Sequence, residues 1–168
     1  GANSMVYTNA IQAILMIIVA VILLTSGFGH FGEGIDAFWS KLDALDPNMS
    51  SSFNENSPLF RDWFEVIVCN FIVGIAIVCQ PHIITKSLLL KTDEDVNKYL
   101  TVAIVVETLF FFVLFAGFYG RLMFPDLMVD GVPMKMDGIL STYVVKQFSV
   151  GVGIVVVLGL IAAGLSTL

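Results

Sequence analysis

The chain has 168 residues, of which 57% are hydrophobic and only 13% are charged, and its formal net charge at pH 7 is −6. Soluble domains carry about 25% charged residues, so this composition excludes an ordinary soluble domain. The negative charge, most of it between residues 33 and 62, argues against nucleic acid as a partner. Length and composition together predict an integral membrane protein.

Four apolar windows meet or approach the roughly 20 residues that a helix needs to cross a bilayer. They cover residues 7–24, 64–84, 100–124 and 144–168 and leave extramembrane loops at 25–63, 85–99 and 125–143. We therefore predict an all-α transmembrane protein whose residues 1–168 form a single unit of four helices. The first window is too long and too rich in Ile and Leu to be the core of a signal peptide.

The distribution of lysine and arginine predicts which loops lie in the cytoplasm. Lys86, Lys91 and Lys98 make the loop at 85–99 the most basic. We therefore place this loop on the cytoplasmic side of the plasma membrane, which in a bacterium is the inner membrane. Loops 25–63 and 125–143 then lie outside. Within the first of these, residues 35–42 have apolar side chains at helical spacing and form either a short surface helix or a loop.

Residues typical of catalysis do not cluster along the chain. The two histidines, His30 and His82, lie on different segments, and no group of His, Cys and carboxylate residues has metal-ligand spacing. The sequence also has no glycine-rich phosphate loop and no nucleophile elbow. It therefore argues against an enzyme and against any cofactor other than a bound ion.

The second apolar window ends in three polar or helix-breaking residues, Gln80, Pro81 and His82. Proline removes a backbone donor and clashes with the carbonyl four residues earlier, and a carbonyl freed in lipid must find a partner in protein or in a water-filled cavity. Such an interruption is typical of transporters and channels. We predict a gate or hinge at these three residues.

The last window carries small and hydroxyl-bearing residues on one helical stripe, at Gly159, Ala163, Ser166 and Thr167. Small residues let another helix approach closely. The two hydroxyls have two interpretations. Together with a nearby backbone carbonyl they form a set of hard oxygen ligands for an alkali cation, or they only bond back to carbonyls one turn earlier, as is common in membrane helices.

Three motifs, in register along the chain, resemble the sodium:solute symporter family. Tyr7-Thr8-Asn9-Ala10-Ile11-Gln12 is similar to that family's Trp/Tyr-Thr-Asp-x-x-Gln, although Asn9 replaces the acid. The segment from Gln80 to Lys86 is similar to Gln-Pro-His-Ile-x-x-Arg/Lys, and the segment from Ala162 to Leu168 is similar to Ala-Ala-x-x-Ser-Thr-Leu. The family includes sodium/proline, sodium/pantothenate and sodium/sugar transporters.

The resemblance implies the LeuT-like fold of two five-helix inverted repeats, of which this chain supplies core helices five to eight. It would then be an internal piece whose partners are the lipid bilayer, a small solute and the remaining helices of the same transporter. Sodium would be the coupling ion. The resemblance assigns sodium binding to the Ser166 and Thr167 hydroxyls and to the Ala163 carbonyl, and it puts in doubt the cation-passage role that the family gives to the acid replaced by Asn9.

The same resemblance points to a solute cavity. In the family the second helix lines this cavity one and two turns before the proline, at positions that correspond to Ile77 and Val73, with Asn70 one turn further out. Glu107 lies two turns into the third helix, where a charge costs at least ~2.5–3.5 kcal/mol. It serves as an acceptor for a solute amine or hydroxyl, as a second cation site, or as a protonated side chain bonded to a neighbouring helix.

These observations favour part of a sodium-coupled secondary transporter that imports a small organic solute by alternating access. The alternative is a complete four-helix membrane protein that acts as a scaffold or assembly subunit and has no transport activity.

Overall fold

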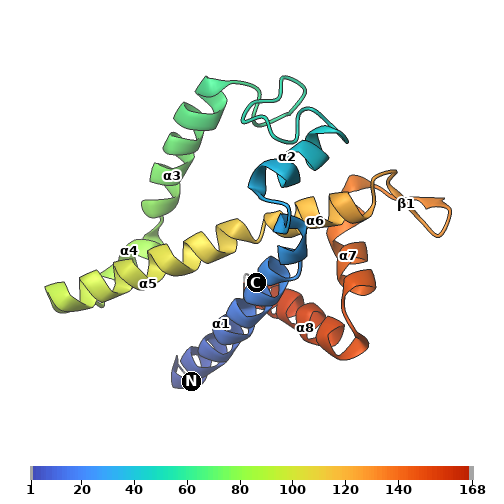
Figure 1. The fold of residues 1–168 in the computed structure, drawn as a ribbon. Coiled ribbons are helices and arrows are strands. Elements are labelled where there is room, and N and C mark those ends of the chain that lie inside the picture. The colour runs from blue at the N-terminus through green and yellow to red at the C-terminus, as the bar shows by residue number, and fades with distance from the viewer. Residues whose placement is uncertain (1, 167–168) are drawn as a thin grey trace. The chain divides into compact units, whose positions relative to one another are not determined.

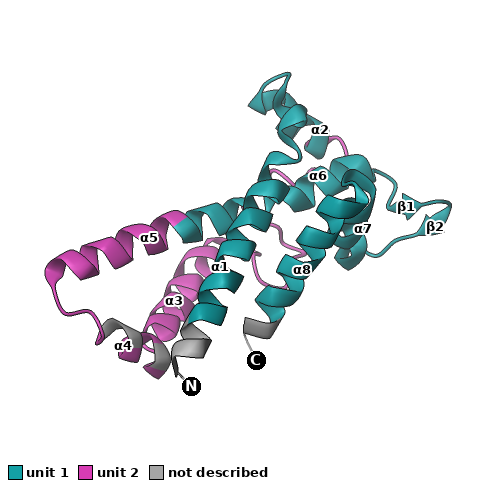
Figure 2. Ribbon diagram, turned by 90° about the horizontal axis from the view of Figure 1, so that it is seen from below, with its two compact units in different colours: residues 1–42, 106–168 teal, residues 43–105 magenta. Residues whose placement is uncertain are grey.

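The computed structural model describes residues 2–166, with the backbone alone for residues 2–6, 82, 86–87 and 165–166. The chain divides into two compact units (Figure 2). Unit 1 contains residues 1–42 and 106–168, and unit 2 contains residues 43–105. Thr167, one of the two hydroxyl residues predicted to bind sodium, lies outside the described residues, and so does the side chain of Ser166.

Unit 1 is built from the long first helix and the elements of the second half of the chain (Figure 1). Its elements are α1 (Ala2–Thr25), a 3-10 helix (Phe28–Phe31), α2 (Ile35–Asp43), the end of α5, α6 (Phe115–Met123), β1 (Met128–Val129), β2 (Val132–Pro133), a second 3-10 helix (Met136–Gly138), α7 (Ile139–Gln147) and α8 (Val150–Ser166). The segment predicted as a short helix or a loop at 35–42 is therefore a helix.

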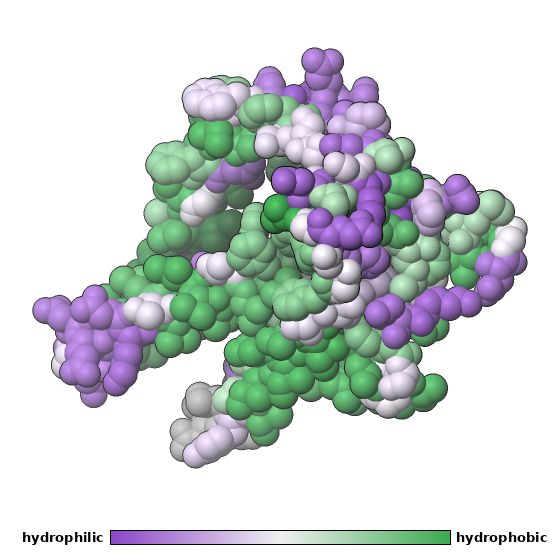
Figure 3. Space-filling view, viewed as in Figure 1, coloured by the Kyte–Doolittle hydropathy of each residue, from purple (hydrophilic) through white to green (hydrophobic). Residues whose placement is uncertain are grey.

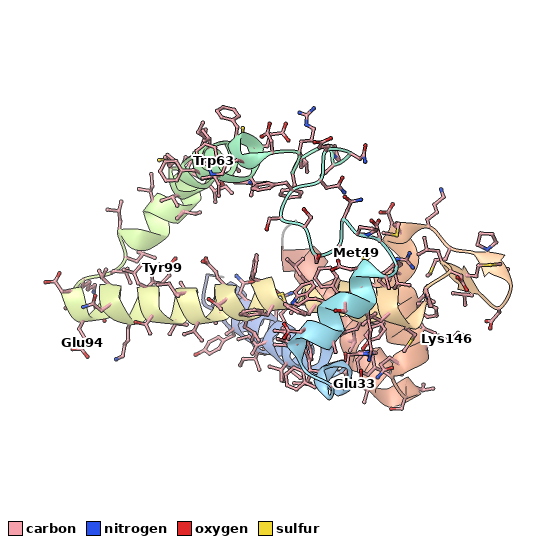
Figure 4. All side chains as sticks on the ribbon, turned by 45° about the horizontal axis from the view of Figure 1, so that its top comes forward. Glu33, Met49, Trp63, Glu94, Tyr99 and Lys146 are labelled. Atoms are coloured by element: carbon pink, nitrogen blue, oxygen red, sulfur yellow. The ribbon has the colours of Figure 1, made fainter. Side chains whose placement is uncertain are left out.

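Unit 2 contains the second apolar window and the beginning of α5. Its elements are a π-helical turn (Phe64–Cys69), α3 (Asn70–Val78), α4 (Pro81–Ser87) and the first part of α5 (Asp93–Phe112). Thr92 caps α5, because its side-chain oxygen accepts a hydrogen bond from the Asp95 N–H at 3.1 Å. Acidic side chains follow in the first turn of α5, where Figure 4 labels Glu94, and they favour the positive end of the helix dipole.

Two of the four predicted spans form helices long and apolar enough to cross a membrane, Tyr7–Phe31 and Asp93–Met123. The other two windows form shorter apolar helices, Phe64–Val78 and Val150–Gly164. Hydrophobic residues cover the visible face of the described parts of α1 and α8, while hydrophilic residues gather at the start of α5 (Figure 3). This distribution is typical of helices whose sides face lipid and whose ends face water.

Local changes of the backbone divide the fourth window and bend the third. The fourth window is divided because Phe148 has an extended backbone with φ −102° and ψ 148°, so α7 ends at Gln147 and α8 begins at Val150. The third is interrupted between α5 and α6, where the Val113 and Leu114 N–H groups donate to the carbonyls of Phe110 and Phe111 at 3.1 and 3.2 Å. These are three-residue spacings, which tighten the chain locally and bend it.

The core of unit 1 is aromatic and lies where α2 packs against α6. Phe38 and Leu42 of α2 and Tyr119 of α6 are fully buried. The rings of Phe38 and Phe115 stack with centroids 6.0 Å apart, and those of Phe38 and Tyr119 meet edge to face at 6.2 Å. Aromatic pairs in these arrangements add about 0.5–1.5 kcal/mol each beyond the apolar area that they bury.

Charged residues of unit 1 form two exposed ion pairs, which involve Glu33 and Lys146 (Figure 4). The Lys41 ammonium lies 2.7 Å from the Glu33 carboxylate and lowers the pKa of that carboxyl, first by a hydrogen bond and then by its charge. Lys146 lies 3.1 Å from Asp130. Exposed pairs of this kind contribute little to stability.

The structure is mostly helical, as predicted, and it adds a small β-hairpin with two residues in each strand. Met128 pairs with Pro133 and Val129 with Val132 in an antiparallel register. The turn between the strands is Asp130-Gly131, and both residues have positive φ, at 50° and 82°. Two consecutive residues with positive φ form the tight turn whose twist matches that of the flanking strands, and Asp-Gly is among the sequences that adopt it most readily.

Candidate functional site

Ala163, the described member of the predicted sodium ligands, lies on α8 beside a groove of about 220 Å³ within unit 1. Residues of α1, of the α5–α6 bend and of α8 line the groove: Met16, Val19, Ala20, Leu23, Phe110, Val113, Gly159, Leu160 and Ala163. None of these lining residues carries a polar side chain. A cation at this place would therefore depend on backbone carbonyls and on hydroxyls beyond the lining residues.

α8 reaches the groove because it packs closely on α1, as both ribbon views show (Figures 1 and 2). Gly159 is buried against Val19, and a Cβ atom built on Gly159 would overlap Val19 Cγ2 and lie 3.2 Å from Val19 Cβ. Val156 of α8 is fully buried. The two described residues of the predicted stripe, Gly159 and Ala163, therefore lie on the side of α8 that is next to α1.

Glu107 lies on α5, three residues before Phe110, which lines the groove. Residues three apart share one face of a helix, so Glu107 and Phe110 lie on the same side of α5. The Glu107 side chain is exposed, and no hydrogen bond or ion pair joins it to any residue that the structure describes. The free-energy cost of placing this charge in an apolar span is therefore not offset by a partner within the described part of the chain.

The helix of unit 2 that was predicted to line a solute cavity presents Val73, Ile77 and Asn70 as exposed residues. The Asn70 side-chain amide donates to two carbonyls of its own helix, Glu65 O at 3.2 Å and Val66 O at 3.0 Å. These carbonyls lie in the π-helical turn, where the backbone spacing changes. The Asn70 side-chain nitrogen is therefore hydrogen-bonded within its own helix.

Side-chain hydrogen bonds that we did not predict from the sequence stabilise the start of this helix. Asp62 accepts a hydrogen bond from the Glu65 N–H at 2.9 Å, and the Glu65 carboxylate accepts one from the Arg61 N–H at 3.0 Å. The Arg61 guanidinium also pairs with Glu65. Asp-x-x-Glu before an apolar run is a capping signature, so the spacing of Asp62 and Glu65 was the signal that would have located this helix start.

The predicted gate residues lie at a break between α3 and α4. The Cys79 N–H donates to Ile75 O at 3.0 Å and the Gln80 N–H donates to Ile77 O at 3.1 Å, so the regular helix ends there. Pro81 begins α4, where its missing N–H leaves no hydrogen bond unmade. The helix predicted to continue to residue 84 is thus two helices. The His82 side chain lies outside the described residues.

Polar contacts that the sequence did not predict tie the end of α1 to α6 and α7. The Ser26 and Tyr143 hydroxyls lie 2.8 Å apart, Gln147 Nε2 donates to Ser26 O at 3.4 Å, and the Tyr119 hydroxyl donates to Leu24 O at 3.2 Å. Burial raises the pKa of the Tyr143 hydroxyl. Ser26 and Tyr143 are 117 residues apart in sequence, and no local pattern predicts such a pair.

Comparison with known proteins adds a family and one relative. A family model described as "Sodium:solute symporter family" matches residues 1–167. The sodium/pantothenate symporter of Escherichia coli (strain K12) is 29% identical over 131 residues, which are 76% of this chain and 26% of that protein. The chain thus spans about a quarter of the length of this relative. No solved structure matches the chain.

Proposed function

Because the chain belongs to the sodium:solute symporter family, we propose that it is part of a sodium-coupled secondary transporter that imports a small organic solute by alternating access. The observation that carries this proposal is the family match, which extends over residues 1–167. In the proposed fold these residues form core helices five to eight of two inverted five-helix repeats, and the remaining helices of the transporter complete the ion and solute sites.

The sodium site in this proposal consists of the Ala163 carbonyl and the hydroxyls of Ser166 and Thr167. One observation supports it. Ala163 lies on α8 beside the groove, and because the lining side chains are apolar, the oxygen ligands of a cation there would be backbone carbonyls and the neighbouring hydroxyls. Sodium and solute are coupled if both bind better to the same state of the helix bundle, because each then increases the affinity for the other.

Replacing Thr167 by valine tests the sodium site in the complete transporter. Valine keeps the shape of threonine but removes the hydroxyl. A hydrogen bond or ligand to a charged partner contributes about 1.5–3 kcal/mol, so we expect the sodium concentration for half-maximal uptake to rise roughly tenfold or more. The measurement is initial uptake of a radiolabelled solute at increasing sodium concentration, with transporter abundance in the membrane measured in parallel.

Thr167→Ser is the matched control, because it keeps the hydroxyl and loses only a methyl group. We expect its sodium dependence to stay close to that of the parent transporter. Unchanged sodium dependence in Thr167→Val, at normal abundance, would mean that the hydroxyl only bonds to its own helix.

The solute cavity in this proposal includes Glu107 on α5 and Asn70, Val73 and Ile77 on the second-window helix. A carboxylate without a partner among the described residues suits a solute that carries an amine or hydroxyl donor, and the Asn70 side-chain oxygen suits the same kind of group. Val73 and Ile77 supply apolar wall. The chemistry of these side chains therefore favours a small solute with at least one hydrogen-bond donor.

The break at Gln80, Pro81 and His82 is the proposed hinge at the cytoplasmic end of this helix. Pro81 offers no donor to the preceding turn, so α4 is not joined to α3 by the continuous hydrogen bonds that keep a helix straight. A few residues at an element boundary are the usual place for such bending. In the proposed membrane orientation, the loop at 85–99 lies in the cytoplasm and the loops at 25–63 and 125–143 lie outside the plasma membrane.

A further inference from the structure

Gly159 is a point of close approach between α8, which carries Ala163, and α1. It is buried, and a Cβ atom at this position would overlap Val19 Cγ2. Val19 itself is only 4% exposed. Because valine is β-branched and its χ1 rotamer in a helix is nearly fixed, its methyl groups have little freedom to move aside. A side chain at position 159 would therefore push the two helices apart by about 1 Å to restore ordinary van der Waals contact.

A second contact holds the beginning of α8. α7 contacts α8 and is joined to it by Phe148 and Ser149, and α7 is bound to the end of α1. This attachment consists of the Ser26–Tyr143 hydroxyl pair at 2.8 Å and the Gln147–Ser26 hydrogen bond. A bulky group at position 159 would thus tilt α8 about its fixed beginning rather than translate the whole helix.

Ala163 lies one turn beyond Gly159 on the same face of α8, and both residues border the groove beside α1. One turn corresponds to roughly 6 Å along the helix axis, so a tilt moves Ala163 more than it moves Gly159. Hard cations need their oxygen ligands within a few tenths of an ångström of an ideal distance. The position of the Ala163 carbonyl is therefore sensitive to the volume at position 159.

We propose that Gly159 is a positioning residue for sodium binding: by admitting Val19, it sets the distance between α1 and α8 and hence the place of the Ala163 carbonyl. This inference rests on the sodium site proposed above and adds a specific residue pair to it. Gly159 does not itself touch the ion. Its effect on sodium is transmitted through the contact with Val19.

The test measures binding of radiolabelled sodium ions to the purified complete transporter, without a solute. Gly159→Ala is expected to weaken sodium binding about tenfold, because misplacing a functional group by about 1 Å can cost as much as a hundredfold in a catalytic site. Val19→Ala removes the methyl groups that the new Cβ would meet. The double variant Gly159→Ala with Val19→Ala is therefore expected to bind sodium within about threefold of the parent, a recovery that general destabilisation would not produce.

Gly153→Ala is the matched control, because it adds the same methyl group to α8 at a place where no atom lies within 4 Å of the new Cβ. It is expected to bind sodium like the parent. If Gly159→Ala does not fold, Val19→Ile enlarges the same contact from α1 and is expected to weaken sodium binding in the same direction. Parent-like binding in these enlarged variants, or no recovery in the double variant, would overturn the proposal.

The distance between spin labels on α1 and α8 distinguishes a failure of the positioning role from a failure of the proposed sodium site. Ile14 and Ile161 are exposed, so labels there do not disturb the contact. Gly159→Ala is expected to lengthen the distance between the labels and to weaken sodium binding. A longer distance with unchanged sodium binding would overturn the positioning role. If the parent transporter bound no sodium and Gly159→Ala still lengthened the distance between the labels, the proposed sodium site would be wrong. The contact between Gly159 and Val19 would then remain supported.

Discussion

Tyr119→Ala is expected to cause a large loss of stability. Tyr119 is fully buried, its ring centroid lies 6.2–6.4 Å from those of Phe31, Phe38, Phe115 and Tyr143, and its hydroxyl donates to Leu24 O. Truncating a buried aromatic residue to alanine costs about 3–5 kcal/mol. We expect a large drop in the thermal unfolding midpoint of the complete transporter in detergent and in its abundance in the membrane.

Tyr119→Phe separates packing from hydrogen bonding. It keeps the ring and removes only the hydroxyl, so its cost is about 1 kcal/mol and its unfolding midpoint should stay near that of the parent. If the midpoint of Tyr119→Ala matched that of Tyr119→Phe, the aromatic cluster between α2 and α6 would not hold unit 1 together.

Glu107→Gln is expected to have a large effect on solute affinity. The substitution keeps the volume and most of the hydrogen-bonding capacity of the side chain but removes its charge. A charged hydrogen bond contributes about 1.5–3 kcal/mol, so the solute concentration for half-maximal uptake should rise roughly tenfold to a hundredfold. The measurement is uptake at saturating sodium with a radiolabelled solute that the parent transports.

Two controls accompany this variant. Glu94→Gln removes a charge from the exposed first turn of the same helix and should leave solute affinity unchanged. Glu107→Leu should retain normal abundance, because it removes the cost of a charge in the membrane. Unchanged affinity in both Glu107 variants would place the residue away from the solute. Loss of abundance in Glu107→Leu alone would make Glu107 a structural hydrogen-bonding partner.

The apolar windows predicted helical segments because a membrane chain has few ways to satisfy its backbone other than helices, and two of the four windows form helices long enough to cross a membrane. They located α1 and the span that contains α5 and α6, and the helical spacing at residues 35–42 was compatible with α2. The small residues of the last window also predicted a close helix contact, which the structure places between Gly159 and Val19. These features depend on local composition and spacing, which can be read directly from a single sequence.

Helix breaks could not be located from hydropathy, because the breaking residues are themselves apolar. Val113 and Leu114 separate α5 from α6, and Phe148, followed by Ser149, separates α7 from α8. Hydropathy treats all three as continuation of a helix. The Ser26–Tyr143 pair was out of reach for a different reason, since its members meet only after the chain between them has folded.

Other features carried local signals that composition alone overlooks. Asp130-Gly131 is a turn sequence between short β-prone segments, and it marks the hairpin that the all-α prediction left out. Asp62 and Glu65 have the spacing of a helix cap. For the candidate site, the sequence supplied Ala163, Glu107 and Asn70, but it did not reveal that the Asn70 amide binds carbonyls of its own helix.

Solute uptake by the purified complete transporter in sealed vesicles is the most direct test of sodium coupling. The vesicles are loaded with potassium buffer and diluted into sodium buffer, or loaded with sodium buffer and diluted into the same sodium buffer, with a panel of radiolabelled small solutes outside. We expect an inward sodium gradient to accumulate at least one solute above its outside concentration, and we expect sodium equal on both sides, with no membrane potential, to abolish the accumulation. Accumulation that is the same with and without a sodium gradient would contradict sodium-coupled transport.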